Sequence, residues 1–269
     1  MVEVVDVVSG KRVRLSRITE DGRMLCVPMD HGVTSGPIKG VDRIRETIRR
    51  LEGAGVTAIL VHKGVLKSLP EPVKTGVIMH ASASTSLSTS PNWKVRVASV
   101  EEAIRLGADA VSVHVNLGNR DEQNMLMKLG AIADECDRWG IPLIAMMYPR
   151  GENVKDPKDP MTIAHAARVG AELGADIVKA PMPSFDPEDI RIIVEGCPVP
   201  VVAAGGPRMD DDRKVLELAK AVVDAGGIGV TFGRNVFQHE RPELMARALR
   251  AVVIEGRSVE EALKILGGR

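Results

Sequence analysis

A closed barrel of eight parallel strands, each followed by a helix, is the fold that the sequence predicts. Eight short apolar runs recur along the 269 residues, and longer amphipathic segments separate them. The runs are nearly continuous in Val, Ile, Ala and Met, which is typical of parallel strands buried on both faces. Glycine often stands between an amphipathic segment and the next run, where it can end a helix in the left-handed conformation.

The apolar runs are the predicted strands, and together they indicate repeated βα units. They lie at 25–32, 57–64, 76–82, 109–116, 142–151, 176–180, 200–206 and 227–235. Eight such units in about 250 residues favour a (β/α)8 barrel, and an open doubly wound sheet is the alternative. We therefore expect one domain over 1–269, with residues 1–23 as an N-terminal extension that packs on the barrel or at a subunit interface.

The segments between the runs carry helix signals. Residues 41–52 place their apolar side chains on one face, and Asp159 precedes a proline at a first helical position. Ser99 with Glu102, and later Ser258 with Glu261, have capping-box spacing. The gap between the second and third strands is short, so we expect no full helix there.

Composition narrows the class of protein. The 36 basic and 36 acidic residues balance, which gives no argument for a nucleic-acid or membrane partner. No apolar run approaches about 18 residues, and the first residues lack a basic-then-apolar signal pattern. The three scattered cysteines fit a reducing compartment and form no metal motif. We therefore expect a cytoplasmic protein.

Polar side chains gather at the ends of the predicted strands, where barrel enzymes place their chemistry. Lys179 stands in the short strand 176–180, so burial would favour its neutral amine, a nucleophile toward carbonyls. The alternative is a lysine that reaches solvent from the strand end. Tyr148, the single tyrosine, ends the preceding strand and could serve there as a general acid or base. Its alternative is a core tyrosine with one structural hydrogen bond.

Asp30 and the glycine-containing loops complete the candidate site. Asp30 shares a strand face with Cys26 and Pro28, and it could hold a charged lysine or accept a proton; otherwise it is a turn residue. His31 follows it with a weaker signal. Loops after the last two strands of a barrel often bind phosphate, which makes candidates of Gly205, Gly206, Gly233 and Arg234, unless these are ordinary turn residues.

Two further features stay open. His31, His62, His80 and His114 lie at strand ends, which invites a metal site, but their spacing favours histidines satisfied by hydrogen bonds. We expect no metal and no cofactor. The hydroxyl-rich segment 82–90 is either a lid, a substrate-binding loop or a plain surface loop.

Several motifs together resemble the archaeal-type class I fructose-bisphosphate aldolase family over nearly the whole chain. They are MDHGVTSGP (29–37), GADAVSVHVN (107–116), PLIAMMYPRG (142–151), GADIVKA (174–180), VVAAGGP (201–207) and GVTFGRNVFQH (229–239). The resemblance implies a (β/α)8 barrel, a Schiff base on Lys179, Tyr148 as proton donor and Asp30 as proton acceptor. It also implies substrate or phosphate contacts from His31, Gly32, Val33, Thr34, Arg150, Gly205, Gly206, Gly233 and Arg234, and a homo-oligomer of high order.

Within the family, the residues resemble a transaldolase-like branch more than the aldolase branch. Met146 stands where the aldolase branch carries tryptophan, and VTSGP (33–37) follows the Asp-His-Gly motif. This branch implies a ketose phosphate donor, 1-deoxy-D-threo-hexo-2,5-diulose 6-phosphate, and L-aspartate 4-semialdehyde as the acceptor. A fructose-1,6-bisphosphate aldolase is the alternative, followed by a non-catalytic barrel that binds phosphosugars.

Overall fold

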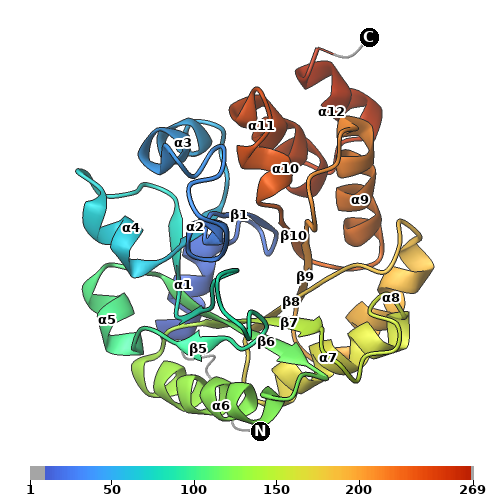
Figure 1. Cartoon of the computed structure of the whole chain (residues 1–269). Coiled ribbons are helices and arrows are strands. Elements are labelled where there is room, and N and C mark those ends of the chain that lie inside the picture. Colours follow the sequence, from blue (N-terminus) through green and yellow to red (C-terminus); the bar gives the residue numbers. More distant parts are fainter. Residues whose placement is uncertain (1–9, 268–269) are drawn as a thin grey trace, which may run out of the picture.

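The computed structural model describes residues 10–267 and shows a closed barrel of eight parallel strands (Figure 1). The order around the barrel is β1-β10-β9-β8-β7-β6-β3-β2, and every neighbouring pair is parallel. The strands are β1 (Met24–Pro28), β2 (Ala58–Val61), β3 (Gly76–His80), β6 (Ala110–Leu117), β7 (Leu143–Pro149), β8 (Ile177–Ala180), β9 (Val201–Ala204) and β10 (Gly229–Thr231). The predicted fold is confirmed, and all eight predicted strands are present.

Helices surround the barrel, and most of them form an outer ring (Figure 1). They are α2 (His31–Ser35), α3 (Ile44–Glu52), α4 (Lys63–Ser68), α5 (Val100–Arg105), α6 (Glu122–Trp139), α7 (Pro160–Glu172), α8 (Pro187–Gly196), α9 (Asp212–Asp224), α10 (Arg234–Phe237), α11 (Pro242–Val253) and α12 (Val259–Ile265). As expected, the connection between β2 and β3 holds only the six residues of α4. No helix within residues 10–267 is long and apolar enough to cross a membrane.

Most strand residues are buried because one face points into the barrel and the other packs under the helices. Met24, Cys26, Ile78, Ile144 and Ile177 belong to the cluster inside the barrel. The outward-facing residues of the same strands belong to two clusters formed with the surrounding helices. The barrel interior is therefore a packed core, and a cavity opens where the strands end.

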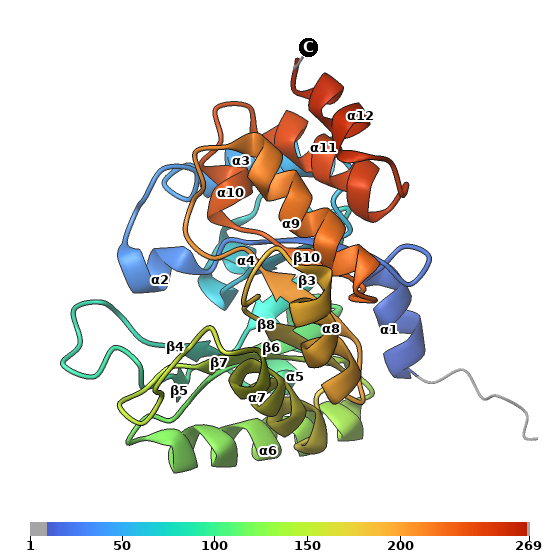
Figure 2. The same ribbon diagram turned by 90° about the vertical axis from the view of Figure 1, so that its right-hand side faces the viewer.

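The helix α1 (Gly10–Ile18) closes the N-terminal end of the barrel. Leu15 and the fully buried Ile18 pack against the interior cluster. Lys11 Nζ lies 2.9 Å from the Asp176 carboxylate, which ties the start of α1 to the base of β8. Residues 1–9 of the expected extension lie outside the described residues. Figure 2 shows α1 at one end of the molecule, with α2 and the hairpin β4–β5 at the opposite end.

That hairpin was not predicted from the sequence. β4 (Ser82–Ala83) pairs antiparallel with β5 (Val95–Arg96), outside the barrel, and the hydroxyl-rich segment forms the connection. Thr34 in α2 holds this connection, because its carbonyl accepts from Ser86 N at 3.0 Å and its hydroxyl donates to the Ser84 carbonyl at 3.2 Å. The segment is thus a covering loop beside the mouth of the barrel.

The packing of α1 against the interior of the barrel gives a testable prediction. Replacing Ile18 with Ala removes buried methyl groups and leaves a cavity, so the free energy of unfolding should fall by about 2–5 kcal/mol. Val13 lies on the same helix but is 51% exposed, so Val13→Ala should cost less than about 0.5 kcal/mol. Urea denaturation followed by circular dichroism measures both. Equal effects in the two variants would contradict the plugging role of α1.

Candidate active site

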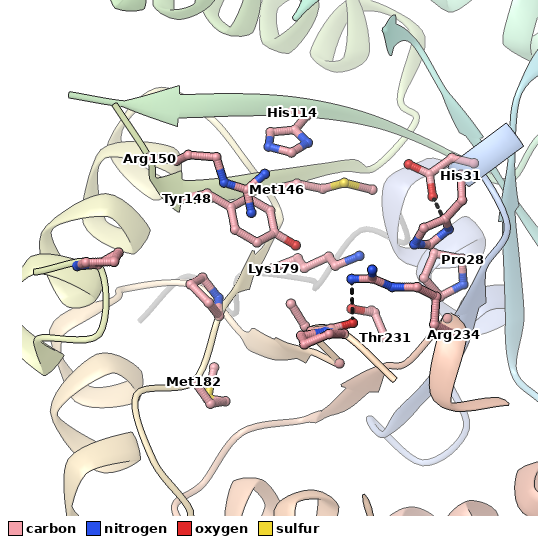
Figure 3. A pocket seen from close by; sticks show the side chains of 18 of the residues that line it. Pro28, His31, His114, Met146, Tyr148, Arg150, Lys179, Met182, Thr231 and Arg234 are labelled. Atoms are coloured by element: carbon pink, nitrogen blue, oxygen red, sulfur yellow. Dashed lines mark hydrogen bonds and ion pairs between the residues drawn. The ribbon is translucent and has the colours of Figure 1, made fainter. Parts of the chain in front are cut away.

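A cavity of about 910 Å³ lies at the C-terminal ends of the strands and brings together most of the predicted site residues. The predicted residues that line it are Asp30, His31, Thr34, Tyr148, Arg150, Lys179, Gly205, Gly206, Gly233 and Arg234. Figure 3 labels His31, Tyr148, Arg150, Lys179 and Arg234 among them. Gly32 and Val33 belong to α2 beside the cavity, and they are not among the residues that line it. Side chains that are distant in the sequence therefore face one space.

Strand register places Tyr148 and Lys179 on the same wall. Met146 of β7 is the direct partner of Lys179 in β8. Side chains alternate along a strand, so Tyr148, two residues after Met146, points to the same interior. Lys179 is only 6% exposed, and Figure 3 shows it and the Tyr148 ring facing the same open space. The amine and the phenol can thus act on one bound molecule.

Asp30 is the one carboxylate among the described residues that line the cavity. Its Oδ1 lies 3.5 Å from His31 Nδ1, and its Oδ2 lies 4.0 Å from His80 Nε2. Burial alone would raise the pKa of Asp30, but His80, His31, Lys179 and His62 hold it well below its usual range, because these groups carry positive charge at the low pH at which the carboxyl itself titrates. The carboxylate is therefore ionised at neutral pH.

The histidines behind Asp30 are held neutral. Burial lowers the pKa of His80 to about 3, and burial is also the main cause that lowers the pKa values of His62 and His114. His80 Nδ1 lies 2.8 Å from Ser112 Oγ, and its Nε2 lies 3.3 Å from Ser82 Oγ. Within residues 10–267, no three His, Cys, Asp or Glu side chains are grouped so as to hold a metal ion.

The loops after β9 and β10 meet at one side of the cavity. Gly206 has a φ of +64°, a conformation that favours glycine. A Cβ on Gly233 would lie 2.8 Å from the Pro28 carbonyl oxygen, so only glycine fits there. Asn235 Nδ2 and Arg234 Nη2 donate to the Gly205 and Gly206 carbonyls, each at 2.8 Å. The two loops are thus joined by hydrogen bonds, with the Arg234 guanidinium at the cavity.

Two buried lysines near the cavity were not singled out from the sequence. Lys94 lines the cavity, and Lys128 Nζ donates to the carbonyls of Lys94 at 2.6 Å and His114 at 2.7 Å. The burial of Lys128 could have been predicted from the sequence, since Lys128 falls on the apolar face of α6 with Met125 and Leu129. The position of Lys94 could not have been predicted, because Lys94 reaches the cavity through the hairpin β4–β5, which the sequence did not indicate.

Arg150 and Tyr148 form one aromatic cluster with His114. The Tyr148 and His114 ring centroids lie 4.7 Å apart, and Arg150 Cζ lies 5.0 Å from the Tyr148 centroid. His114 Nε2 is 2.9 Å from Asn116 Oδ1, which fixes the imidazole. The phenol is therefore held between a neutral ring and a cation at the cavity wall.

Comparison with known proteins shows the family of the chain. Residues 24–239 match the profile of the DeoC/LacD family aldolases, and the chain belongs to this family. It is 42% identical over 248 residues to the 2-amino-4,5-dihydroxy-6-oxo-7-(phosphonooxy)heptanoate synthase of Streptomyces griseus, covering 91% of this chain and 90% of that protein. It is also 42% identical over 261 residues to the 2-amino-3,7-dideoxy-D-threo-hept-6-ulosonate synthase 1 of Archaeoglobus fulgidus, covering 96% of each.

Solved structures give the same class of protein. An archaeal fructose 1,6-bisphosphate aldolase superposes with a TM-score of 0.85 at 30% identity, covering 91% of this chain and 99% of that chain. A second structure, described as a Schiff base forming fructose-1,6-bisphosphate aldolase, has a TM-score of 0.84 at 29% identity, with 90% and 98% coverage. The protein is therefore an enzyme of the class I, lysine Schiff-base aldolase type.

The buried neutral histidines predict a pH dependence of stability. The native pKa of His80, about 3, lies below the ordinary value of 6.5, so the unfolded state binds a proton first as the pH falls. The free energy of unfolding should therefore decrease below pH 6.5, with His80 contributing up to about 1.4 kcal/mol per pH unit. His80→Gln should flatten this slope, whatever it does to stability at neutral pH.

The exposed histidine His165 provides the matched control, since His165→Gln should leave the slope unchanged. Urea denaturation at a series of pH values between 4 and 7 measures both variants. His62 and His114 should keep part of the slope in His80→Gln, since burial lowers their pKa values too. A slope in His80→Gln as steep as that of the wild type would contradict a neutral His80 in the native protein.

Proposed function

We propose that the protein is a transaldolase-type synthase that moves a three-carbon unit from a ketose phosphate to an amino-acid aldehyde. The donor is 1-deoxy-D-threo-hexo-2,5-diulose 6-phosphate and the acceptor is L-aspartate 4-semialdehyde. The product is 2-amino-3,7-dideoxy-D-threo-hept-6-ulosonate, the compound in the name of the Archaeoglobus fulgidus relative. The observation that carries the proposal is the buried Lys179, which shares one cavity with Tyr148 and the ionised Asp30.

The first half of the reaction cleaves the donor. The Lys179 amine attacks the C2 carbonyl, and loss of water leaves an iminium, which withdraws electrons from the neighbouring carbon. The C4 hydroxyl then loses its proton, the C3–C4 bond breaks, and its electron pair converts the iminium to an enamine. Hydroxypyruvaldehyde phosphate leaves with the phosphate group. The apolar barrel beneath Lys179 shields these steps from water.

The second half builds the product. The enamine carbon attacks the aldehyde of L-aspartate 4-semialdehyde, and the new alkoxide takes a proton. Water then hydrolyses the iminium and restores the free amine. Tyr148 is the proposed proton donor, and Asp30, ionised at neutral pH, is the proposed proton acceptor. The loops with Gly205, Gly206, Gly233 and Arg234 are proposed to bind the phosphate of the donor.

A fructose-1,6-bisphosphate aldolase is the second candidate. The structures at 30% and 29% identity favour it, since they share the barrel and are described as aldolases. The relatives at 42% identity, both named as seven-carbon amino-acid synthases, favour a seven-carbon amino-acid product more strongly, and the Archaeoglobus fulgidus relative carries the name of the transaldolase product. The reaction would begin an alternative route to 3-dehydroquinate and the aromatic amino acids. We further propose, from the family resemblance, a cytoplasmic homo-oligomer of high order.

Borohydride trapping tests the covalent intermediate. With the donor present, sodium borohydride should reduce the iminium and leave a stable adduct on Lys179, which peptide mass spectrometry locates. Lys179→Met should form no adduct and lose condensation activity. The same trap with fructose 1,6-bisphosphate, together with assays of both reactions, separates the two candidate functions. An active Lys179→Met variant would contradict a Schiff-base mechanism.

Removal of the phenol tests proton transfer. Tyr148→Phe keeps the ring between His114 and Arg150 but removes the hydroxyl, so kcat should fall by about 10²–10⁴. Donor binding should change little, because the ring and the neighbouring charges remain. Steady-state kinetics with both substrates measures this. A variant with normal kcat would exclude Tyr148 as the proton donor and would leave a core role for its ring.

A further inference from the structure

The Asp30 carboxylate, the proposed proton acceptor, receives no hydrogen bond from the described residues 10–267. Asp30 stands at the N-cap position of α2, but its side chain does not cap the helix. Two imidazole nitrogens approach the carboxylate, His31 Nδ1 at 3.5 Å from Oδ1 and His80 Nε2 at 4.0 Å from Oδ2. A partly buried carboxylate is stabilised by donors that face it. The two imidazoles are therefore the groups that can orient this carboxylate.

His80 is the more firmly held of the two imidazoles. It ends β3 and is 3% exposed, with Nδ1 at 2.8 Å from Ser112 Oγ in β6 and Nε2 at 3.3 Å from Ser82 Oγ in β4. Both serines are themselves fully buried. His31, in contrast, belongs to the five-residue helix α2, and a quarter of its side chain is exposed. The barrel therefore fixes the His80 ring, which cannot turn away from Asp30 without losing its contacts with the serines.

The charge of Asp30 decides which nitrogen of His80 carries the proton. Each ring nitrogen faces a serine hydroxyl, and a hydroxyl can donate or accept, so the serines suit either neutral tautomer. The ionised carboxylate suits one tautomer only, because it attracts an N–H at Nε2 and repels a lone pair there. The proton therefore belongs on Nε2, and Ser112 donates to Nδ1. The neutral imidazole thus presents a donor to Asp30.

Asp30 can close the remaining gap to His80. The separation of 4.0 Å is longer than a hydrogen bond. Catalytic hydrogen bonds often reach their final length only when the substrate binds. A movement of the Asp30 carboxylate by about 1 Å would bring Oδ2 within hydrogen-bond distance of Nε2, and no capping contact opposes this movement. Because the serines hold the imidazole, His80 is the fixed partner and the carboxylate is the group that moves.

We propose that His80 is a positioning residue that holds Asp30 for proton transfer during cleavage of the ketose phosphate. Its Nε2–H donates to Oδ2, and the other carboxylate oxygen accepts the proton of the C4 hydroxyl. The electrons of the broken O–H bond form the new carbonyl, and those of the C3–C4 bond pass to the iminium on Lys179. His80 keeps its own proton throughout. This role rests on the proposed function, in which Asp30 is the proton acceptor.

Single-turnover cleavage of the ketose phosphate, measured beside borohydride trapping, tests this role. His80→Leu removes the N–H, so a misplaced carboxylate should slow cleavage about 10- to 100-fold. The ketose phosphate concentration that gives half-maximal trapping should change less than about 3-fold, because Lys179 and its attack on the carbonyl are unaffected. His80→Gln should lose less than His80→Leu, since its amide can donate to Asp30. Ser112→Ala, which removes the contact at Nδ1, should fall between the wild type and His80→Leu.

A double-mutant cycle shows whether His80 acts through Asp30. Asp30→Asn alone should slow cleavage by about 10²–10⁴. In that background, His80→Leu should slow cleavage by less than a further factor of about 3, because residues that act as a unit have non-additive effects. The exposed His165 provides the control, since His165→Leu should leave cleavage and trapping unchanged. Circular dichroism verifies folding of each variant, and Ser112→Ala replaces His80→Leu in the cycle where the latter does not fold.

Three results would overturn the positioning role of His80. They are a wild-type cleavage rate in the variant used for the cycle, losses that add in full with Asp30→Asn, and a loss in His80→Gln as large as that in His80→Leu. A wild type that forms no borohydride adduct with the ketose phosphate would instead overturn the proposed function itself.

Discussion

The burial of a lysine in an apolar barrel is the constraint on which the rest of the site depends. Lys179 stands two residues beyond Ile177, which belongs to the interior cluster, and it is almost fully removed from solvent. An ammonium group in such surroundings is costly unless opposite charge lies nearby. Asp30 is the one carboxylate among the described residues that line the cavity. Bringing these two side chains to one cavity requires β1 and β8, from distant parts of the chain, to close into one barrel.

The neutral histidines follow from the same constraint. A charged imidazole at His80 or His114 would add to the positive charge that already surrounds Asp30. Burial lowers their pKa values, and Ser112, Ser82 and Asn116 satisfy the rings by hydrogen bonds. His80 and His114 therefore add no positive charge at neutral pH, and the charged side chains of the site are those of the acidic and basic residues that line the cavity.

Much of the fold was predictable because parallel strands buried on both faces have a distinctive composition. All eight strands appear near their expected positions, and the full capping box at Ser258 and Glu261 forms. At Ser99 only half of the box forms, because Glu102 instead binds Lys63 and Lys67, an interaction between helices that spacing does not reveal. The third helix starts at Ile44, later than the apolar pattern at 41–52 suggests. Tertiary contacts thus adjusted the ends of elements and not their order.

The sequence by itself determined the number and kind of strands, and with them the end of the barrel at which Asp30, Tyr148, Lys179 and the glycine loops would gather. This is possible because a strand end is a local property of the chain. The tertiary structure alone decided which groups share the cavity with them. Register sets Lys179 beside Met146, and an unpredicted hairpin brings in Lys94. Such contacts depend on distances between remote segments, which no local pattern of residues encodes.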